Sequence, residues 1–193
     1  MSTAKTTRKP TRRSAQKTET RRRILDAASA LFLRQGFGAT GVDGVMAEAG
    51  LTAGGFYAHF RSKTHLLAEA LRHSFENGMT TRAFSAENRS SEERIRAFID
   101  LYVSPTHRDQ PELGCPLVGL AAELGRESAE VRRIVAAYLE SAIHAVAGSR
   151  HRKKALAALA TMVGAVLLSR ITRGTPLSDE ILAAARGSLK SDM

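Results

Sequence analysis

Apolar residues recur at every third or fourth position along most of the chain, and no stretch shows the sustained alternation of a β-strand. In the first predicted helix, for example, Ile24, Ala28 and Leu31 mark one face, and Gly36 follows where helices commonly end. Serine, threonine and glycine residues divide the rest of the pattern into similar segments. The sequence therefore predicts an all-α protein of about nine helices.

Hydroxyl side chains mark most of the predicted helix starts, because an oxygen there can accept a hydrogen bond from a backbone N–H of the first turn. The first helix is expected to begin near Thr18, since residues 1–17 contain almost no large apolar side chains and are expected to be disordered in isolation. Pro116 suits the first turn of a short helix, whereas residues 105–114 are expected to form a polar loop. The residues expected to cap helices are Thr40, Thr52, Ser62, Ser90, Ser128 and Ser178.

Positive charge is concentrated at the N-terminus. The chain holds 29 Lys and Arg residues against 19 Asp and Glu residues, a net charge of +10. Residues 1–23 contain nine of the basic residues and a single acidic one, Glu19, so they carry +8 of this charge. A basic segment beside a nearly neutral body favours a partner with a phosphate backbone. The alternative is a solvated tail that keeps the protein soluble.

The remaining composition excludes several classes of protein. A single cysteine, Cys115, rules out an internal disulfide framework and fits a reducing cytoplasm. The N-terminus lacks the apolar core of a secretory signal, and the longest uncharged apolar run, residues 155–169, is shorter than a membrane span. His65 and His73 lack the spacing of a metal site, and no phosphate-loop or nucleophile motif occurs. We therefore expect a cytoplasmic protein without catalytic residues, cofactor or metal.

The second and third predicted helices are the most informative pair. They cover residues 42–49 and 53–60, and a tight turn at Gly50-Leu51-Thr52 joins them, as in a helix-turn-helix. The residues at the start of the third helix are all small: Thr52, Ala53, Gly54 and Gly55. Small residues let the backbone approach base edges, so this arrangement fits a helix that enters the major groove of DNA.

One long stretch carries a more specific signature. It contains Ile24-Leu25-Asp26-Ala27-Ala28, Leu31-Phe32, Gly36-Phe37, Thr40, Val45-Met46-Ala47-Glu48-Ala49-Gly50-Leu51-Thr52, Gly54-Gly55-Phe56-Tyr57-Ala58-His59-Phe60-Arg61-Ser62-Lys63 and Leu66-Leu67. This stretch, about residues 20–71, resembles the DNA-binding domain of the TetR (tetracycline-repressor-like) family. The resemblance implies an all-α, homodimeric bacterial transcription regulator, usually a repressor that a small molecule releases from DNA.

The resemblance also implies roles for single residues. Those that match DNA phosphate contacts are Thr40, Tyr57, His59 and Lys63, and those on the base-reading face are Thr52, Ala53 and Gly55. Because the base-reading residues are small, we expect DNA shape to matter more than direct hydrogen bonds to bases. Phe56 and Phe60 are expected in the core, and for Tyr57 and His59 the alternative is a packed aromatic pair.

The C-terminal part carries no motif of comparable strength. The resemblance implies that it binds an inducer and forms the homodimer through its last two helices. Within the helix predicted over about residues 150–173, the stretch 155–169 is apolar on all sides, which favours burial against a partner subunit; packing within one core is the alternative. The candidate ligand-binding residues, each of which could instead be ordinary core, are Phe75, Phe98, Tyr102, Cys115, Leu117, Leu120 and Tyr138.

Cys115 supports two hypotheses. The segment Gly114-Cys115-Pro116-Leu117 resembles a Gly-Cys-Pro/Leu motif of one branch of the family. A thiol at a helix N-terminus has a lowered pKa, which favours a sensor of electrophiles or oxidants. The alternative is a buried small residue, because free cysteine is among the most buried residue types.

Together these patterns predict a basic arm (residues 1–17), a helix-turn-helix domain (18–64) and a ligand-binding and dimerisation domain (65–193). We interpret the protein as a homodimeric repressor of the cytoplasm and nucleoid, which binds double-stranded palindromic operator DNA until an unidentified small-molecule inducer or electrophile releases it. The alternatives are a non-enzymatic helical ligand carrier or an enzyme with an incidental basic tail, and a non-specific nucleoid-type DNA binder.

Overall fold

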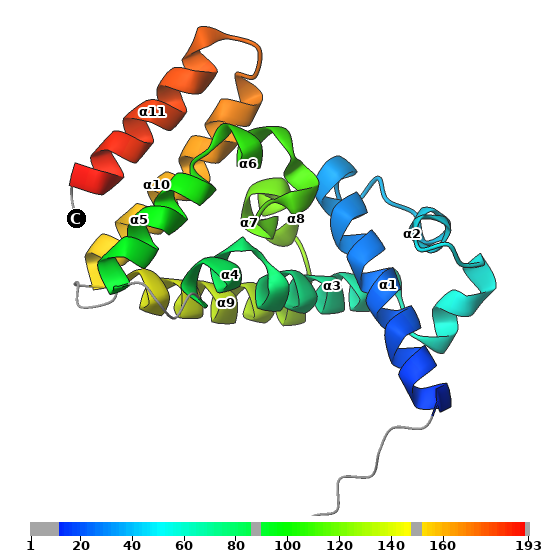
Figure 1. The fold of residues 1–193 in the computed structure, drawn as a ribbon. Helices are drawn as coiled ribbons and strands as arrows, with labels where there is room; N and C mark the ends of the chain where they lie inside the picture. The colour runs from blue at the N-terminus through cyan, green and yellow to red at the C-terminus, as the bar shows by residue number, and fades with distance from the viewer. Residues whose placement is uncertain (1–11, 86–89, 148–151, 192–193) are drawn as a thin grey trace, which may run out of the picture.

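The computed structural model describes residues 12–85, 90–147 and 152–191, and every regular element in these ranges is helical (Figure 1). The elements are α1 (Arg12–Gln35), α2 (Val42–Glu48), η1 (Ala53–Ala58), α3 (Lys63–Asn77), α4 (Met79–Phe84), α5 (Ser91–Tyr102), α6 (Pro105–Asp109), η2 (Pro111–Leu113), α7 (Pro116–Gly119), α8 (Ala121–Leu124), α9 (Ala129–Ala147), α10 (Arg152–Ile171) and α11 (Pro176–Ser191). The all-α prediction is confirmed, and within these ranges the chain has eleven α-helices rather than about nine.

The additional helices are short ones that begin or end at local interruptions. The segment that follows Cys115 is divided at Leu120 into α7 and α8. The segment predicted as a polar loop contains α6, because the Ser104 side chain caps its first turn and Pro105 occupies its first position. The predicted polar loop was therefore wrong over residues 105–109, and also over residues 111–113, which form the 3-10 helix η2.

The N-terminal helix is longer than predicted. α1 begins at Arg12, so the predicted start near Thr18 was wrong, and residues 12–17 do not belong to a disordered arm. The Thr18 hydroxyl donates to the Ser14 carbonyl within the helix, and the residues before it are mostly good helix formers. The rest of the predicted arm, residues 1–11, lies outside the described residues.

Half of the expected caps are present. Ser62, Ser90 and Ser128 each accept a first-turn backbone N–H, and Glu93 completes a capping box with Ser90. The other three predicted caps were wrong. Thr40 and Thr52 make no capping bond at α2 or η1, and α11 begins at Pro176, before Ser178. The buried Ser178 hydroxyl instead donates to the Ser169 carbonyl and ties α11 to α10.

Two apolar cores organise the fold. The first joins α1, α2, η1 and α3, and it also contains Leu120, Leu124 and Val131 from the C-terminal part. The second joins α5, α9, α10 and α11. Figure 1 shows the two regions at opposite sides of the molecule, with α7 and α8 between them. The predicted domain boundary after residue 64 falls inside α3, so no linker separates the two regions.

Among the described residues, only α10 is long and apolar enough to span a membrane by length and composition. It packs against α9 and α11, and Ala155, Met162 and Val166 on one face are buried. A helix of a water-soluble helical core meets the same criteria. The exposed apolar side chains of α10 lie on another face, and they are Leu156, Leu167, Leu168 and Ile171.

A buried histidine connects α5, α6 and α7. His107 is 3% exposed, and its Nδ1–H donates to the Tyr102 carbonyl while Nε2 accepts the Cys115 N–H. This pattern requires the neutral ring, because a protonated imidazole has no acceptor nitrogen. Burial and, to a smaller extent, the charge of Arg170 lower the pKa of His107 from 6.5 to about 4, although the hydrogen bond to the Tyr102 carbonyl opposes this shift.

The buried neutral His107 makes the folded state less stable in acid. In the unfolded chain this histidine takes up a proton near pH 6.5, whereas in the folded protein it does so only near pH 4. The contribution of His107 to the free energy of unfolding is therefore complete above pH 6.5 and is lost as the pH falls from 6.5 to 4. We expect a loss of about 2 kcal/mol between pH 7 and pH 5 from this residue. Urea unfolding at both pH values measures it, and His107→Gln, less stable at pH 7, should lose less on acidification. Equal losses in the two proteins would contradict this.

Candidate DNA-binding surface and ligand cavity

The turn between α2 and η1 is fixed by backbone hydrogen bonds. The Gly50 N–H donates to the Ala47 carbonyl at 2.9 Å, and the Leu51 N–H donates to the Met46 carbonyl at 2.8 Å. Gly50 has a φ of +67°, a conformation that favours glycine. A Cβ at this position would also lie 3.0 Å from the guanidinium of Arg23. The tight glycine turn expected from the sequence is therefore present.

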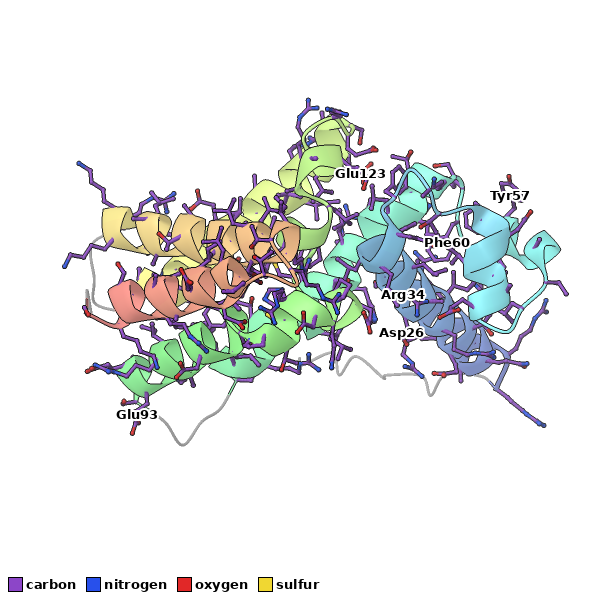
Figure 2. All side chains as sticks on the ribbon, turned by 90° about the horizontal axis from the view of Figure 1, so that it is seen from above. Asp26, Arg34, Tyr57, Phe60, Glu93 and Glu123 are labelled. Atoms are coloured by element: carbon purple, nitrogen blue, oxygen red, sulfur yellow. The ribbon has the colours of Figure 1, made fainter. Side chains whose placement is uncertain are left out.

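The segment after the turn is a 3-10 helix, η1, rather than the longer helix expected over residues 53–60. Two adjacent glycines make this segment a weak helix former, and the short helix is held by its aromatic residues. Phe56 and Phe60 are 0% and 1% exposed, with ring centroids 5.7 Å apart, as expected of core residues. Tyr57, in contrast, is 75% exposed, and Figure 2 shows it at the outer edge of the molecule. One edge of its ring contacts Phe56, with the ring centroids 5.2 Å apart, but most of the side chain faces solvent, so Tyr57 is not a core residue.

The expected base-reading residues lie just before Tyr57 in the chain. Thr52 and Ala53 are exposed and Gly55 is half-buried, and Gly54 between them is exposed as well. A Cβ at Gly54 would meet no atom within 4 Å, so the space in front of this backbone is open. The start of η1 thus exposes small residues, and the exposed side chain of Tyr57 follows them in the same short helix.

His59 lies half-buried at the end of η1. Its Nδ1 is buried without a hydrogen-bond partner, and its backbone carbonyl accepts from Arg21. Burial, followed by the positive charges of Lys17 and Arg21, lowers the pKa of His59 below 6.5. The ring is therefore neutral at pH 7.

The other two expected phosphate contacts lie near the loop that joins α1 to α2. Lys63 begins α3 directly after the Ser62 cap; its Nζ is 3.3 Å from the Gly38 carbonyl and 4.4 Å from the centre of the Phe37 ring. Thr40 is only 1% exposed, and its hydroxyl donates to the Gly36 carbonyl at 2.7 Å. The expectation that the Thr40 hydroxyl contacts phosphate is not met in this structure, because that group is buried and bonded within the loop.

Two arginines of α1 have structural roles that the sequence pattern did not predict. Arg21 donates to the His59 carbonyl and, at 2.8 Å, to Glu69, and its guanidinium lies 4.3 Å from the centre of the Phe60 ring. Arg23 donates to the Ala49 carbonyl at the end of α2. Both side chains brace the helix-turn-helix from α1. Their partners lie 26 to 48 residues away along the chain, so no local spacing could have indicated them.

The C-terminal part contains two large cavities. One of about 730 Å³ lies between α5, α7, α8, α9 and α10, and a second of about 600 Å³ lies between α3, α4 and α9. Four of the candidate ligand-binding residues line the larger cavity: Phe98, Tyr102, Leu117 and Tyr138. Tyr138 also lines the second cavity, where its ring stacks on Phe75 with centroids 3.8 Å apart. The larger cavity is mostly apolar, and Arg132 is its only charged lining residue among those described.

Comparison with known proteins covers both regions. The family model described as bacterial regulatory proteins, tetR family, matches residues 24–70, which include α2, the turn and η1. The tetracyclin repressor-like C-terminal domain model matches residues 91–185. The chain belongs to the TetR family of bacterial transcription regulators. The matched N-terminal residues include the buried Phe56 and Phe60 and the exposed Tyr57.

Individual relatives agree with the family models. The HTH-type transcriptional repressor KstR of Rhodococcus jostii (strain RHA1) is 35% identical over 50% of this chain, and the match spans only 44% of that relative. An uncharacterised HTH-type transcriptional regulator of Mycobacterium tuberculosis (strain ATCC 25618 / H37Rv) is 27% identical over 81% of this chain and 88% of its own length. The crystal structure of a TetR transcriptional regulator from Chloroflexus aurantiacus J-10-FL has a TM-score of 0.75 and 28% identity, and the match covers 92% of this chain and 95% of that one.

Two of the candidate ligand-binding residues of this TetR-family protein lie elsewhere. Leu120 is buried in the first core and lines neither large cavity. Cys115 is buried beside the hydroxyl of Tyr138, 3.9 Å from its Sγ, and also lines neither of them. Burial raises the pKa of the Cys115 thiol above 9.0, and α7 is only four residues long. The expected lowering of this pKa by a helix N-terminus was therefore wrong, and the buried-residue alternative fits.

No metal site is evident in the described part of the chain, where no three His, Cys, Asp or Glu side chains gather closely enough to hold an ion.

The brace from α1 makes Arg21 important for the stability of the helix-turn-helix. Arg21→Gln removes charged hydrogen bonds to two partly buried acceptors and the contact with Phe60, so we expect a loss of about 2 kcal/mol in the free energy of unfolding. Arg22→Gln is the matched control, because Arg22 pairs only with the exposed Glu19 and Asp26 and should have a much smaller effect. Urea denaturation of both variants checks this, and equal effects would contradict a bracing role for Arg21.

Proposed function

We propose that this TetR-family protein is a homodimeric repressor that binds a palindromic operator and releases it when a small molecule occupies the C-terminal part. The observation that carries this proposal is the exposure of Tyr57 beside the open, small-residue start of η1, while its neighbours Phe56 and Phe60 are buried. A segment fixed in this way offers a shaped surface to a major groove. Acting on bacterial DNA, the protein would work in the cytoplasm, at the nucleoid.

The proposed contacts divide into two groups. Tyr57, His59 and Lys63 hold phosphates, and the neutral His59 acts as a hydrogen-bond donor rather than as a cation. Thr52, Ala53 and Gly55 face the bases. Because these three offer few long donors, DNA shape supplies much of the specificity. Thr40 supports the loop from inside and is not part of this set.

Exposed basic residues add an electrostatic contribution. Arg12, Arg13 and Lys17 lie exposed on the first turns of α1, whereas Arg21, Arg22 and Arg23 are occupied by partners within the chain. Arg12, Arg13 and Lys17 are therefore available to bind DNA phosphates near the operator, and their binding would release counterions from the DNA.

The dimer is proposed to form through α10 and α11. Leu167, Leu168 and Ile171 of α10 and Leu177 of α11 are exposed apolar side chains, and Ile171 is 72% exposed. A cluster of this kind on a soluble protein marks an interaction surface. A two-fold dimer would present two helix-turn-helix units to successive major grooves about 34 Å apart.

The proposed inducer is a mainly apolar small molecule. The larger cavity, about 730 Å³, is within the size range of drug-sized ligand sites, and its walls are almost entirely hydrocarbon and aromatic. The second cavity adjoins it at Tyr138 and offers room for a longer molecule.

The DNA-binding proposal is tested with a duplex that the full-length chain selects from a random-sequence library. The selected sequence should be a palindrome. Tyr57→Ala should weaken binding to it by at least about tenfold, because a bond to a charged phosphate is lost while the core loses only one edge contact with Phe56. Leu113→Ala is the control, since Leu113 is 59% exposed and far from η1 in the sequence. Titration by fluorescence anisotropy measures both, and failure to enrich any sequence would contradict the function.

The proposed dimer surface is tested with Ile171→Glu. Because this side chain is 72% exposed in one subunit, the charge should not disturb the monomer, but it would be buried unpaired in the interface. We expect the dimer dissociation constant to rise at least about tenfold. Sedimentation velocity over a range of concentrations measures it, with Leu113→Glu as the control. An unchanged dimer in Ile171→Glu would place the interface elsewhere.

A further inference from the structure

One carboxylate of the C-terminal part binds the loop that precedes the helix-turn-helix. The Phe37 N–H donates to Oε2 of Glu123 at 3.0 Å, and the Gly38 N–H donates to Oε1 at 2.6 Å. The two hydrogen bonds therefore use both oxygens of a charged acceptor, which is the stronger class of hydrogen bond in proteins. Figure 2 shows Glu123 at the boundary between the C-terminal part and the helix-turn-helix region, well away from Tyr57.

The loop is shaped for this contact. Gly36 has a φ of +88°, and a Cβ there would lie 3.1 Å from a Glu123 oxygen. A Cβ at Gly38 would lie 3.2 Å from the other oxygen. Glycines at both positions thus let the backbone approach the carboxylate closely. The carboxylate and the loop are thus complementary in shape, although Gly38 and Glu123 are 85 residues apart in the sequence.

The same loop is held from its other side by Lys63. The Lys63 ammonium donates to the Gly38 carbonyl and lies over the Phe37 ring. Lys63 begins α3 and is one of the proposed phosphate contacts. The loop at residues 36–38 therefore lies between the C-terminal part and the proposed DNA-binding surface, with Glu123 bound to its N–H groups and Lys63 bound to its carbonyl.

Glu123 is carried by an element that lines the larger cavity, although its own side chain does not line it. It lies in α8, whose Ala121 and Leu124 line that cavity, together with Gly125 just after the helix. α8 has only four residues and is separated from α7 at Leu120, so it is a small element. A molecule that presses on Ala121 or Leu124 therefore presses on the element that carries the carboxylate.

We propose that Glu123 is the positioning residue that couples occupancy of the larger cavity to the DNA-binding surface. An occupant displaces α8, the Glu123 carboxylate moves relative to the amides of Phe37 and Gly38, and the loop shifts together with Lys63. This inference rests on the proposed function, because it requires DNA binding that responds to the cavity.

The test uses the full-length chain, its selected duplex and a side chain that stands in for the ligand. Val163→Phe fills the larger cavity from α10, and Leu139→Trp fills it from α9, which provides a second occupant if one variant folds poorly. Each is measured with Glu123 present and with Glu123→Ala, as a double-mutant cycle. With Glu123 present, an occupant should change the DNA dissociation constant about tenfold, within the usual range of coupling between sites. With Glu123→Ala the change should be less than about twofold.

Glu127→Ala is the matched control, because this nearby carboxylate does not bind the loop. In a protein with Glu127→Ala, each cavity-filling substitution should still change the DNA dissociation constant about tenfold. Amide hydrogen exchange gives a second measurement: both occupants should speed exchange at Phe37 and Gly38 when Glu123 is present. Equal changes in affinity in the Glu123 and Glu123→Ala backgrounds, or no change by either occupant in a protein that binds its duplex, would overturn the proposal. A wild-type chain that selects no duplex would instead overturn the proposed function.

Discussion

The burial of Phe56 and Phe60 holds η1, the segment proposed to face DNA, in place. Both rings lie in the core that α1, α2 and α3 share, and each buried phenylalanine contributes about 2 kcal/mol or more. Each glycine in a helix costs about 1 kcal/mol, so Gly54 and Gly55 would leave this segment unstable by itself. Because burial outweighs that cost, η1 can keep small residues at its start and still hold Tyr57 outward.

The basic residues of α1 serve two separate purposes. Arg21 and Arg23 point into the fold and bind backbone carbonyls at the ends of η1 and α2. Arg12, Arg13 and Lys17, one to three turns earlier, stay exposed. One helix thus fixes the position of the helix-turn-helix and also places positive charge beside it. The net charge of the segment alone does not distinguish these purposes, since a bonded arginine and a free one count equally.

The connection between the two regions is both apolar and polar. Leu120, Leu124 and Val131 enter the first core from the C-terminal part, and Glu123 binds the loop before α2. The larger cavity lies directly behind α8. A close-packed interior transmits displacement, so a change in this cavity has a short physical route to the proposed DNA-binding surface. No flexible linker separates the cavity from that surface, because α3 runs through the boundary between the two regions.

The sequence by itself determined the all-α class, the approximate positions of the long helices, the glycine turns at Gly36 and Gly50, the core positions of Phe56 and Phe60 and the family. The helices and turns depend on residues within about four positions of one another, which periodicity reports directly, and the family on a signature that extends over about residues 20–71. Only the tertiary structure decided the partners of Arg21 and Glu123, the inward turn of Thr40 and the raised pKa of Cys115. A polar side chain bonds to whatever the fold brings beside it, and burial sets the charge it can carry, so neither can be deduced from its neighbours in the chain.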